Sequence, residues 1–220
     1  MSTLMRAPKH CGSWYWDLEE STPTGPESEL IAATLIKASQ FIEVLSSHDL
    51  LTATKIEYNW YAPNCGWTGL LSSLSIPETP LHTPDLPERV LGSRPTAYPN
   101  AYIREFYVTG SGTWFDSKGN PRKEFGLVNL SLSPFSIGIS AEVAVHHDIW
   151  SWFDFSGRPH PEVYNRNAPR LANALREITS VLGVEPDPGE PTYFGHAVGF
   201  GVSTPDADDD GLGPNLTDHL

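Results

Sequence analysis

Two histidines and an aspartate stand side by side near the middle of this 220-residue chain. His146, His147 and Asp148 are residue types that bind metal ions or transfer protons in catalysis. His146 ends the segment 136–146, in which apolar and polar residues alternate as in a half-buried strand, and His147 and Asp148 follow it. Alternation places His146 on the polar face and His147 on the apolar face. We therefore expect the two rings to point in opposite directions.

The same alternation limits what a metal ion could contact here. Glu142, His146 and Asp148 share the polar face, but Glu142 and His146 are about 13 Å apart along a strand that rises ~3.3 Å per residue. A zinc ion requires every ligand within about 2.2 Å. We therefore expect neither a metal nor a cofactor. The alternative is an enzyme that uses His146 and Asp148 as general acid and base, assisted by His160 or His196.

Aromatic side chains follow at once, with Trp150 and Trp152 at their centre. Most of the seven tryptophans should belong to the core, because each buries a large apolar area. The functional alternative is a patch that anchors a protein partner, since tryptophan, tyrosine and arginine dominate binding hot spots. The next segment offers three residues for such a patch, Arg158, His160 and Tyr164.

The C-terminus carries a second candidate contact, the acidic run Asp206, Asp208, Asp209 and Asp210. Three of these aspartates and Gly211 match the opening of an EF-hand loop, but Thr217 stands where that loop requires a bidentate glutamate. We therefore interpret the run as a solvated acidic tail, with incidental Ca²⁺ binding as the alternative.

The charge of the chain limits which classes of partner we expect. The net charge is −13, and the chain from Gly183 onward has eight acidic residues and no lysine or arginine. No basic patch is available to displace counterions from nucleic acid or to bind an anionic membrane surface. We expect no nucleic-acid or membrane partner, and electrostatics favour a basic protein.

Short signatures of common enzyme classes are missing. The sequence contains no GxxxxGK[ST], GxGxxG, HExxH, paired CxxC or GxSxG. The N-terminus lacks the apolar core of a signal peptide, and no run approaches 18 apolar residues. We therefore expect a cytoplasmic location, in which Cys11 and Cys65 are free thiols.

The elements that position these residues follow from periodicity. Apolar residues at helical spacing predict helices over about 27–46 and 168–182, the second with Asn167 as its N-cap and Pro169 in its first turn. Between and after them we expect strands at 52–62, 66–76, 101–110, 124–133, 136–146 and 192–202, with a long Pro-rich loop at 77–100. The prediction is a single α+β domain over 1–204, an antiparallel meandering sheet with two main helices packed on one face, followed by the acidic tail 205–220.

Two hypotheses of function follow. In its size, acidity and lack of active-site motifs the chain resembles the immunity proteins that neutralise toxin enzymes. That resemblance implies a non-enzymatic protein that binds and inhibits a basic partner, its acidic tail imitating the phosphates that a basic enzyme expects. The alternatives are the enzyme built on His146 and Asp148, and a structural subunit of a larger assembly.

Overall fold

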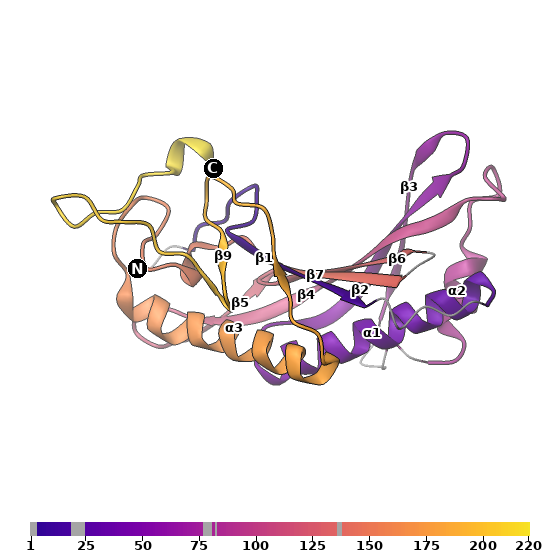
Figure 1. Cartoon of the computed structure of the whole chain (residues 1–220), viewed down its shortest axis with the longest axis horizontal. Coiled ribbons are helices and arrows are strands. Elements are labelled where there is room, and N and C mark those ends of the chain that lie inside the picture. The colour runs from indigo at the N-terminus through magenta and orange to yellow at the C-terminus, as the bar shows by residue number, and fades with distance from the viewer. Residues whose placement is uncertain (1–3, 19–24, 77–80, 82, 136–137) are drawn as a thin grey trace.

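Eight antiparallel strands form one sheet along the length of the molecule (Figure 1). The computed structural model describes residues 4–18, 25–76, 81, 83–135 and 138–220. Seven strands lie in the order β3, β2, β4, β6, β7, β1, β8, and β5 pairs with β4 beside this path. Their bounds are β1 Gly12–Leu18, β2 Thr52–Ala62, β3 Gly66–Ser75, β4 Tyr102–Phe115, β5 Pro121–Phe125, β6 Asn129–Phe135, β7 Gly138–Val145 and β8 Asp187–Pro188.

Strict alternation explains why the strands form where the sequence places them. In β2 the buried side chains Ile56, Tyr58 and Trp60 alternate with partly exposed ones. Trp14 and Trp16 of β1 likewise share one buried face. The Trp16 ring packs edge-on against Phe41 of the first helix at 5.2 Å, so this face of the sheet is the one that the helices cover.

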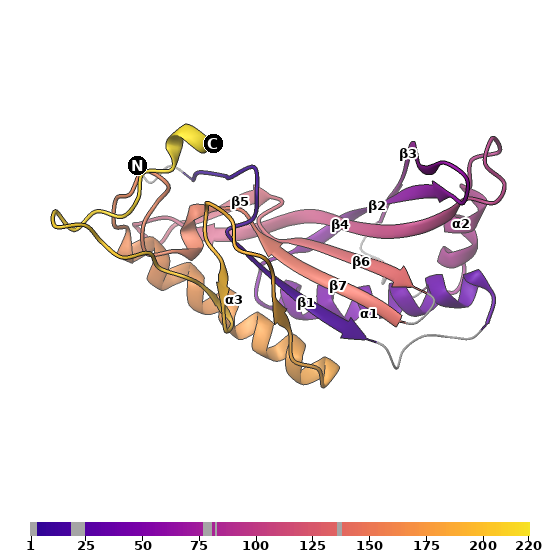
Figure 2. The ribbon, with the colours of Figure 1, turned by 45° about the horizontal axis from the view of Figure 1, so that its top comes forward.

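Three helices accompany the sheet: α1 Glu27–Ser47, α2 Leu86–Gly92 and α3 Pro161–Leu182. The two long helices, α1 and α3, lie on the same side of the sheet (Figures 1 and 2). This confirms the α+β class, with two main helices on one face of an antiparallel sheet. The core lies between the layers, where Ile31 and Leu35 of α1 and Leu171 and Leu175 of α3 are buried.

Helix α1 is long and apolar enough to cross a membrane by length and composition alone. A core helix of a globular domain has the same properties. Here eight of its side chains are buried, among them Phe41 and Leu45, which have no exposed surface. Packing beneath the sheet therefore accounts for its apolar character.

The second long helix begins earlier than the sequence predicts. Asn167 and Pro169 are typical of a helix start, yet α3 runs without interruption from Pro161 and contains Pro169 in its interior. Asn167 is fully buried and bonds to β4 instead of capping a helix: its Oδ1 accepts from the Phe115 N–H, and its Nδ2 donates to the Phe115 carbonyl, both at 2.9 Å. The position predicted for the N-cap was wrong because a tertiary contact explains the asparagine.

Two other predicted elements also differ. The predicted strand 192–202 is divided into the short strands β9 Ala197–Val198 and β10 Gly201–Val202, which form their own antiparallel pair. Gly195 and Gly199 adopt positive φ angles that an extended strand does not tolerate. Within the Pro-rich range 77–100 the structure adds α2, while residues 77–80 and 82 lie outside the described part of the chain.

Candidate binding surfaces

The His-His-Asp stretch divides into one partly exposed and two buried groups. Strand β7 ends at Val145, and a short 3₁₀ helix covers Asp148–Trp150. His147 and Asp148 each have 1% of their surface exposed, whereas His146 lines an open pocket that Asp148 does not reach. The predicted pairing of His146 with Asp148 assumed that the alternation continued. The 3₁₀ helix breaks that alternation, so the two residues do not share a cleft.

Both buried groups have pKa values that favour their neutral forms. Burial raises the pKa of Asp148 to about 7, opposed by the hydrogen bond that its Oδ1 accepts from the Met5 N–H at 3.2 Å. Burial, followed by the charge of Arg6, lowers the pKa of His147 to about 4. Asp148 Oδ2 and His147 Nδ1 have no hydrogen-bond partner. Asp148 therefore anchors the N-terminal segment through this hydrogen bond.

The aromatic residues that follow form two groups. Trp150 is 1% exposed and belongs to the core, so it presents no contact surface in this structure. Trp152, by contrast, is half-buried and packs edge-on against Tyr164 of α3 at 5.7 Å. His160 joins this pair: its backbone N–H donates to the Trp152 carbonyl, and its Nε2 is 2.9 Å from the Ser151 carbonyl oxygen. Arg158 is exposed in the same loop.

The acidic C-terminal segment folds back onto this loop. The Gly213 N–H donates to the Gly157 carbonyl, and the Leu216 N–H donates to the Phe155 carbonyl, both at 2.8 Å. Gly213 also lies against the Phe153 ring, where a Cβ would approach to 2.6 Å. Gly213 and Leu216 therefore attach the C-terminal segment to this loop at positions that follow the acidic run. We refer to residues 152–160, Tyr164 and 205–220 as the C-terminal face; its acidic segment projects at one end of the molecule (Figure 1).

The acidic run forms an exposed turn. Asp206, Asp208, Asp209 and Asp210 are all exposed. Asp208 shapes the turn, because its Oδ1 accepts the N–H groups of Asp210 and Leu212 at 3.0 and 2.8 Å. None of the five ion pairs among the described residues includes one of these aspartates. In the same part of the chain no group of three His, Cys, Asp or Glu side chains is placed to hold a metal ion.

Apolar side chains on and around the C-terminal segment are also exposed. The Tyr193 ring is 76% exposed and stacks on His219 at 5.1 Å. Leu212 and Leu220 are 43% and 47% exposed. A smaller hollow of about 190 Å³ lies between Tyr193 and the loop around Phe155. The C-terminal segment therefore presents exposed apolar groups as well as the acidic turn.

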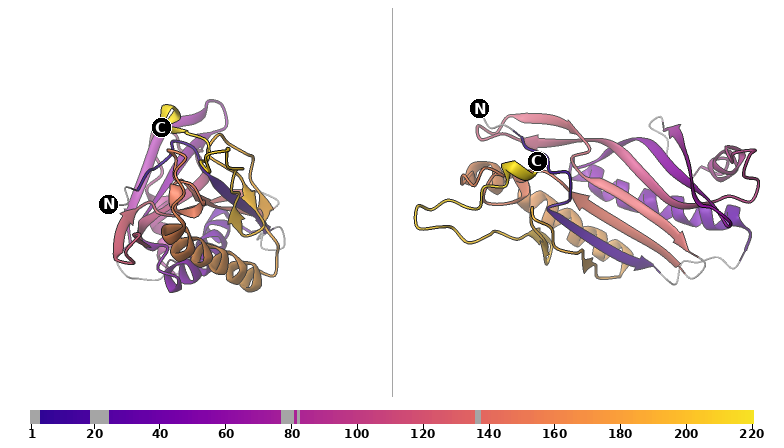
Figure 3. Two further views of the ribbon diagram at one scale, coloured as in Figure 1. Left: turned by 90° about the vertical axis from the view of Figure 1, so that its left-hand side faces the viewer. Right: turned by 90° about the horizontal axis from the view of Figure 1, so that it is seen from above.

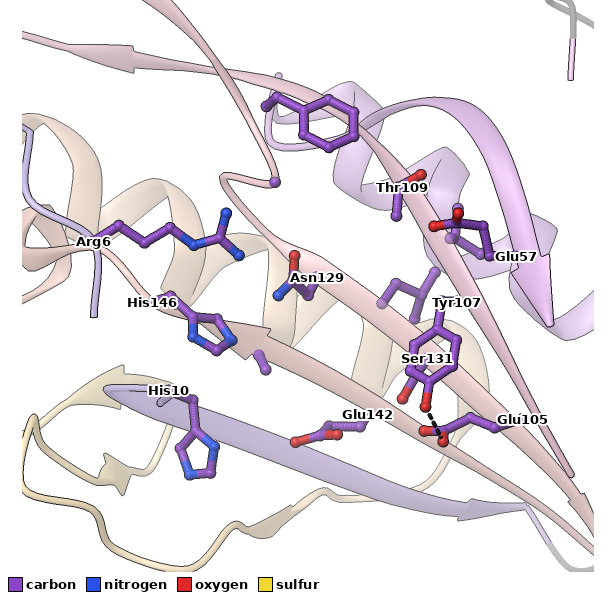
Figure 4. Close-up of a pocket in the computed structure, with 15 residues that line it drawn as sticks. Arg6, His10, Glu57, Glu105, Tyr107, Thr109, Asn129, Ser131, Glu142 and His146 are labelled. Carbon is purple, nitrogen blue, oxygen red and sulfur yellow. Dashed lines mark hydrogen bonds between the residues drawn. The ribbon is translucent and has the colours of Figure 1, made fainter. Parts of the chain in front are cut away.

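A second surface, which the sequence analysis did not predict, lies on the sheet face opposite the helices (Figure 3, right). A pocket of about 450 Å³ opens there over β2, β4, β6 and β7. Arg6, His146 and Asn129 stand at one end, and three glutamates stand at the other (Figure 4).

Strand register explains how these residues meet. One row across the sheet consists of residues paired in turn, Glu57, Tyr107, Ser131 and Glu142. Each is polar and lies within a strand whose neighbouring positions are apolar. The signal in the sequence is the set of polar residues on the exposed faces of four strands. Only the order and register of the strands bring that set together.

Comparison with known proteins finds no match: no protein-family model, no curated protein and no solved structure is significantly similar to the chain. The functional argument therefore depends on the two surfaces described above.

Proposed function

We propose that this chain is a non-enzymatic cytoplasmic binding protein that docks on a basic protein partner through the C-terminal face and inhibits it, in the manner of a toxin-neutralising immunity protein. The observation that carries the proposal is the exposed turn containing Asp206, Asp208, Asp209 and Asp210. Four carboxylates without an ion-pair partner stand there on a segment that backbone hydrogen bonds hold against the 153–157 loop.

A fixed acidic turn suits this role better than a flexible tail. Ordering a flexible segment on binding costs free energy, and this cost weakens the affinity. A turn that is already folded before binding avoids it. Closely spaced carboxylates also produce a local negative potential that accelerates the approach of a basic protein. Carboxylates held in a row resemble the phosphates that a nucleic-acid-binding or nucleotide-binding enzyme recognises, and this supports inhibition by occupation of such a site.

The neighbouring apolar groups supply the other half of an interface. Binding hot spots combine aromatic anchors with a polar rim. Exposed Leu212 follows the acidic run along the chain, and exposed Tyr193 stacks on His219 of the same segment. Half-buried Trp152 and Tyr164 form the aromatic pair of the adjoining loop. Arg158 and His160 complete the rim. Trp150 is excluded from this surface because it is buried.

Affinity capture from the native lysate, followed by mass spectrometry, tests the proposal. We expect one basic protein in a stoichiometric amount at about 0.15 M salt and its loss at about 1 M salt, where the Debye length falls to about 3 Å. Recovery of no stoichiometric partner at 0.15 M salt contradicts the proposal, as does a partner whose recovery is unchanged by salt.

A further inference from the structure

The pocket on the open face of the sheet carries an inference independent of the proposed partner. Its volume of about 450 Å³ is that of a small-molecule site, for which the usual range is about 300–1,000 Å³. It is lined by one arginine and three glutamates, which leaves a net charge of −2 with the histidines neutral. This net negative lining would repel a ligand that carries only a negative charge. A ligand that carries only a positive charge would offer no anionic group to the arginine.

One end of the pocket is suited to an anionic group. The Arg6 guanidinium lies over Gly126, since a Cβ on this glycine would stand 3.3 Å from Arg6 Nη1. Arg6 belongs to none of the ion pairs among the described residues. His146 stands beside it, and burial together with the charge of Arg6 lowers the pKa of His146, which keeps the ring neutral. Arg6 therefore supplies an unpaired guanidinium fork for a carboxylate.

The other end is suited to a cation, and tyrosines orient its carboxylates. The Tyr107 hydroxyl donates to Glu105, and the Tyr15 hydroxyl bonds to Glu142. Burial and the Glu142 charge raise the pKa of Tyr15 to about 12, so this tyrosine remains a donor. Glu57 already pairs with Lys55 at 2.9 Å. Glu105 and Glu142 are therefore the two carboxylates that retain an uncompensated negative charge.

The two ends are separated by a distance that one extended molecule can bridge. Glu142 lies in β7 and His146 directly follows its end, four residues and about 13 Å further along the chain, and the side chains of Figure 4 project into the pocket between them. Asn129 and Ser131 line the interval. We propose that this pocket binds a small basic amino acid of the arginine class, with its carboxylate on Arg6 and its side-chain cation between Glu105 and Glu142.

Titration of the full-length protein with three related probes tests this site by calorimetry. L-Arginine carries both end groups, agmatine lacks the carboxylate, and L-citrulline lacks the side-chain charge. We expect saturable binding of arginine, and an affinity lower by about tenfold or more for each of the other two, since each lacks one of the charged hydrogen bonds that arginine makes. A peptide that ends in arginine carries the same carboxylate and side-chain cation. Titration with this peptide distinguishes a free amino acid from the C-terminus of a protein as the ligand.

Variants assign the two ends. Arg6→Gln should weaken arginine about tenfold and leave agmatine unchanged, whereas Glu142→Gln should weaken both. Arg104→Gln is the matched control: it also removes one positive charge, but Arg104 lies over Tyr61, outside the pocket lining. Absence of saturable arginine binding, equal affinity for citrulline, or binding of the peptide alone would overturn the proposal. None of these outcomes affects the capture experiment on the C-terminal face.

Discussion

At the scale of single residues, two neighbouring buried groups make stability depend on pH in opposite directions. Asp148 has a folded pKa of about 7 against an ordinary value of 3.8, so its contribution is fully present below pH 4 and is lost as the pH rises through 7. His147 has a folded pKa of about 4 against 6.5, so its contribution is present above pH 6.5 and is lost as the pH falls toward 4. The window from pH 6.5 to 8.5 therefore isolates Asp148.

Asp148→Asn tests this assignment. The asparagine Oδ1 can still accept from the Met5 N–H, but the side chain no longer ionises. We expect the variant to be more stable than the wild type at pH 8.5, by up to about 4 kcal/mol, with the difference shrinking toward pH 6.5. Urea unfolding across that window measures it. Parallel stability curves for the two proteins would mean that Asp148 does not titrate there.

At the scale of elements, Asn167 of α3 bonds to strand β4, beside a second hydrogen bond that Arg170 Nη1 donates to the Thr113 carbonyl at 2.8 Å. Asn167 bonds to both backbone groups of Phe115, and its Nδ2 also donates to the Val163 carbonyl at 2.8 Å. We expect Asn167→Ala to lower the free energy of unfolding by about 2–3 kcal/mol, because buried polar groups lose their partners. Asn165→Ala, at an exposed position on the same helix, is the control. Equal effects of the two substitutions in chemical denaturation would show that the hydrogen bonds of Asn167 do not stabilise the contact between α3 and β4.

Pro169 gives a prediction of the opposite sign. It lies exposed in the interior of α3, where its ring clashes with the preceding turn and its missing N–H removes a helical hydrogen bond. Pro169→Ala should therefore stabilise the protein by about 1–3 kcal/mol, measured as a higher denaturation midpoint. Pro161→Ala, at the first turn where proline is tolerated, should change stability by less than about 0.5 kcal/mol. A destabilised Pro169→Ala variant would show that the proline is needed for the shape of the helix.

The sequence predicts those elements whose residues are explained locally. Alternation was sufficient for β2 and for the opposite placement of His146 and His147, because one face of each strand is buried. It failed at Asp148, where a 3₁₀ helix replaces the strand, and at Asn167, whose role depends on a contact 52 residues away along the chain. The open-face pocket was missed because its residues come from separate strands, and only the register makes them neighbours.

At the scale of the whole molecule, the helices, the polar pocket and the acidic turn occupy different sides of the sheet. The helices cover one face of the sheet, and the acidic turn projects from one end (Figure 1). The polar pocket occupies the opposite face of the sheet. A net charge of −13 repels anionic partners over the whole surface. The C-terminal face adds to this general field four carboxylates at fixed positions beside exposed apolar groups. The position of these carboxylates, as well as the total charge of the protein, should therefore determine which partner binds.

Two variants with equal net charge separate position from total charge. The first replaces each of the four aspartates of the acidic turn by asparagine, which at Asp208 preserves the Oδ1 acceptor of the turn. The second neutralises four exposed acids outside the C-terminal face, through the substitutions Glu29→Gln, Glu43→Gln, Asp85→Asn and Glu88→Gln.

Capture of the basic partner by the wild type and these two variants, at about 0.15 M salt, is the most direct measurement of the central claim. We expect the four-aspartate variant to lose at least about tenfold in partner recovered, whereas the control retains nearly all of it, because interface charges act through their positions. Equal recovery by both variants would contradict docking through the C-terminal face.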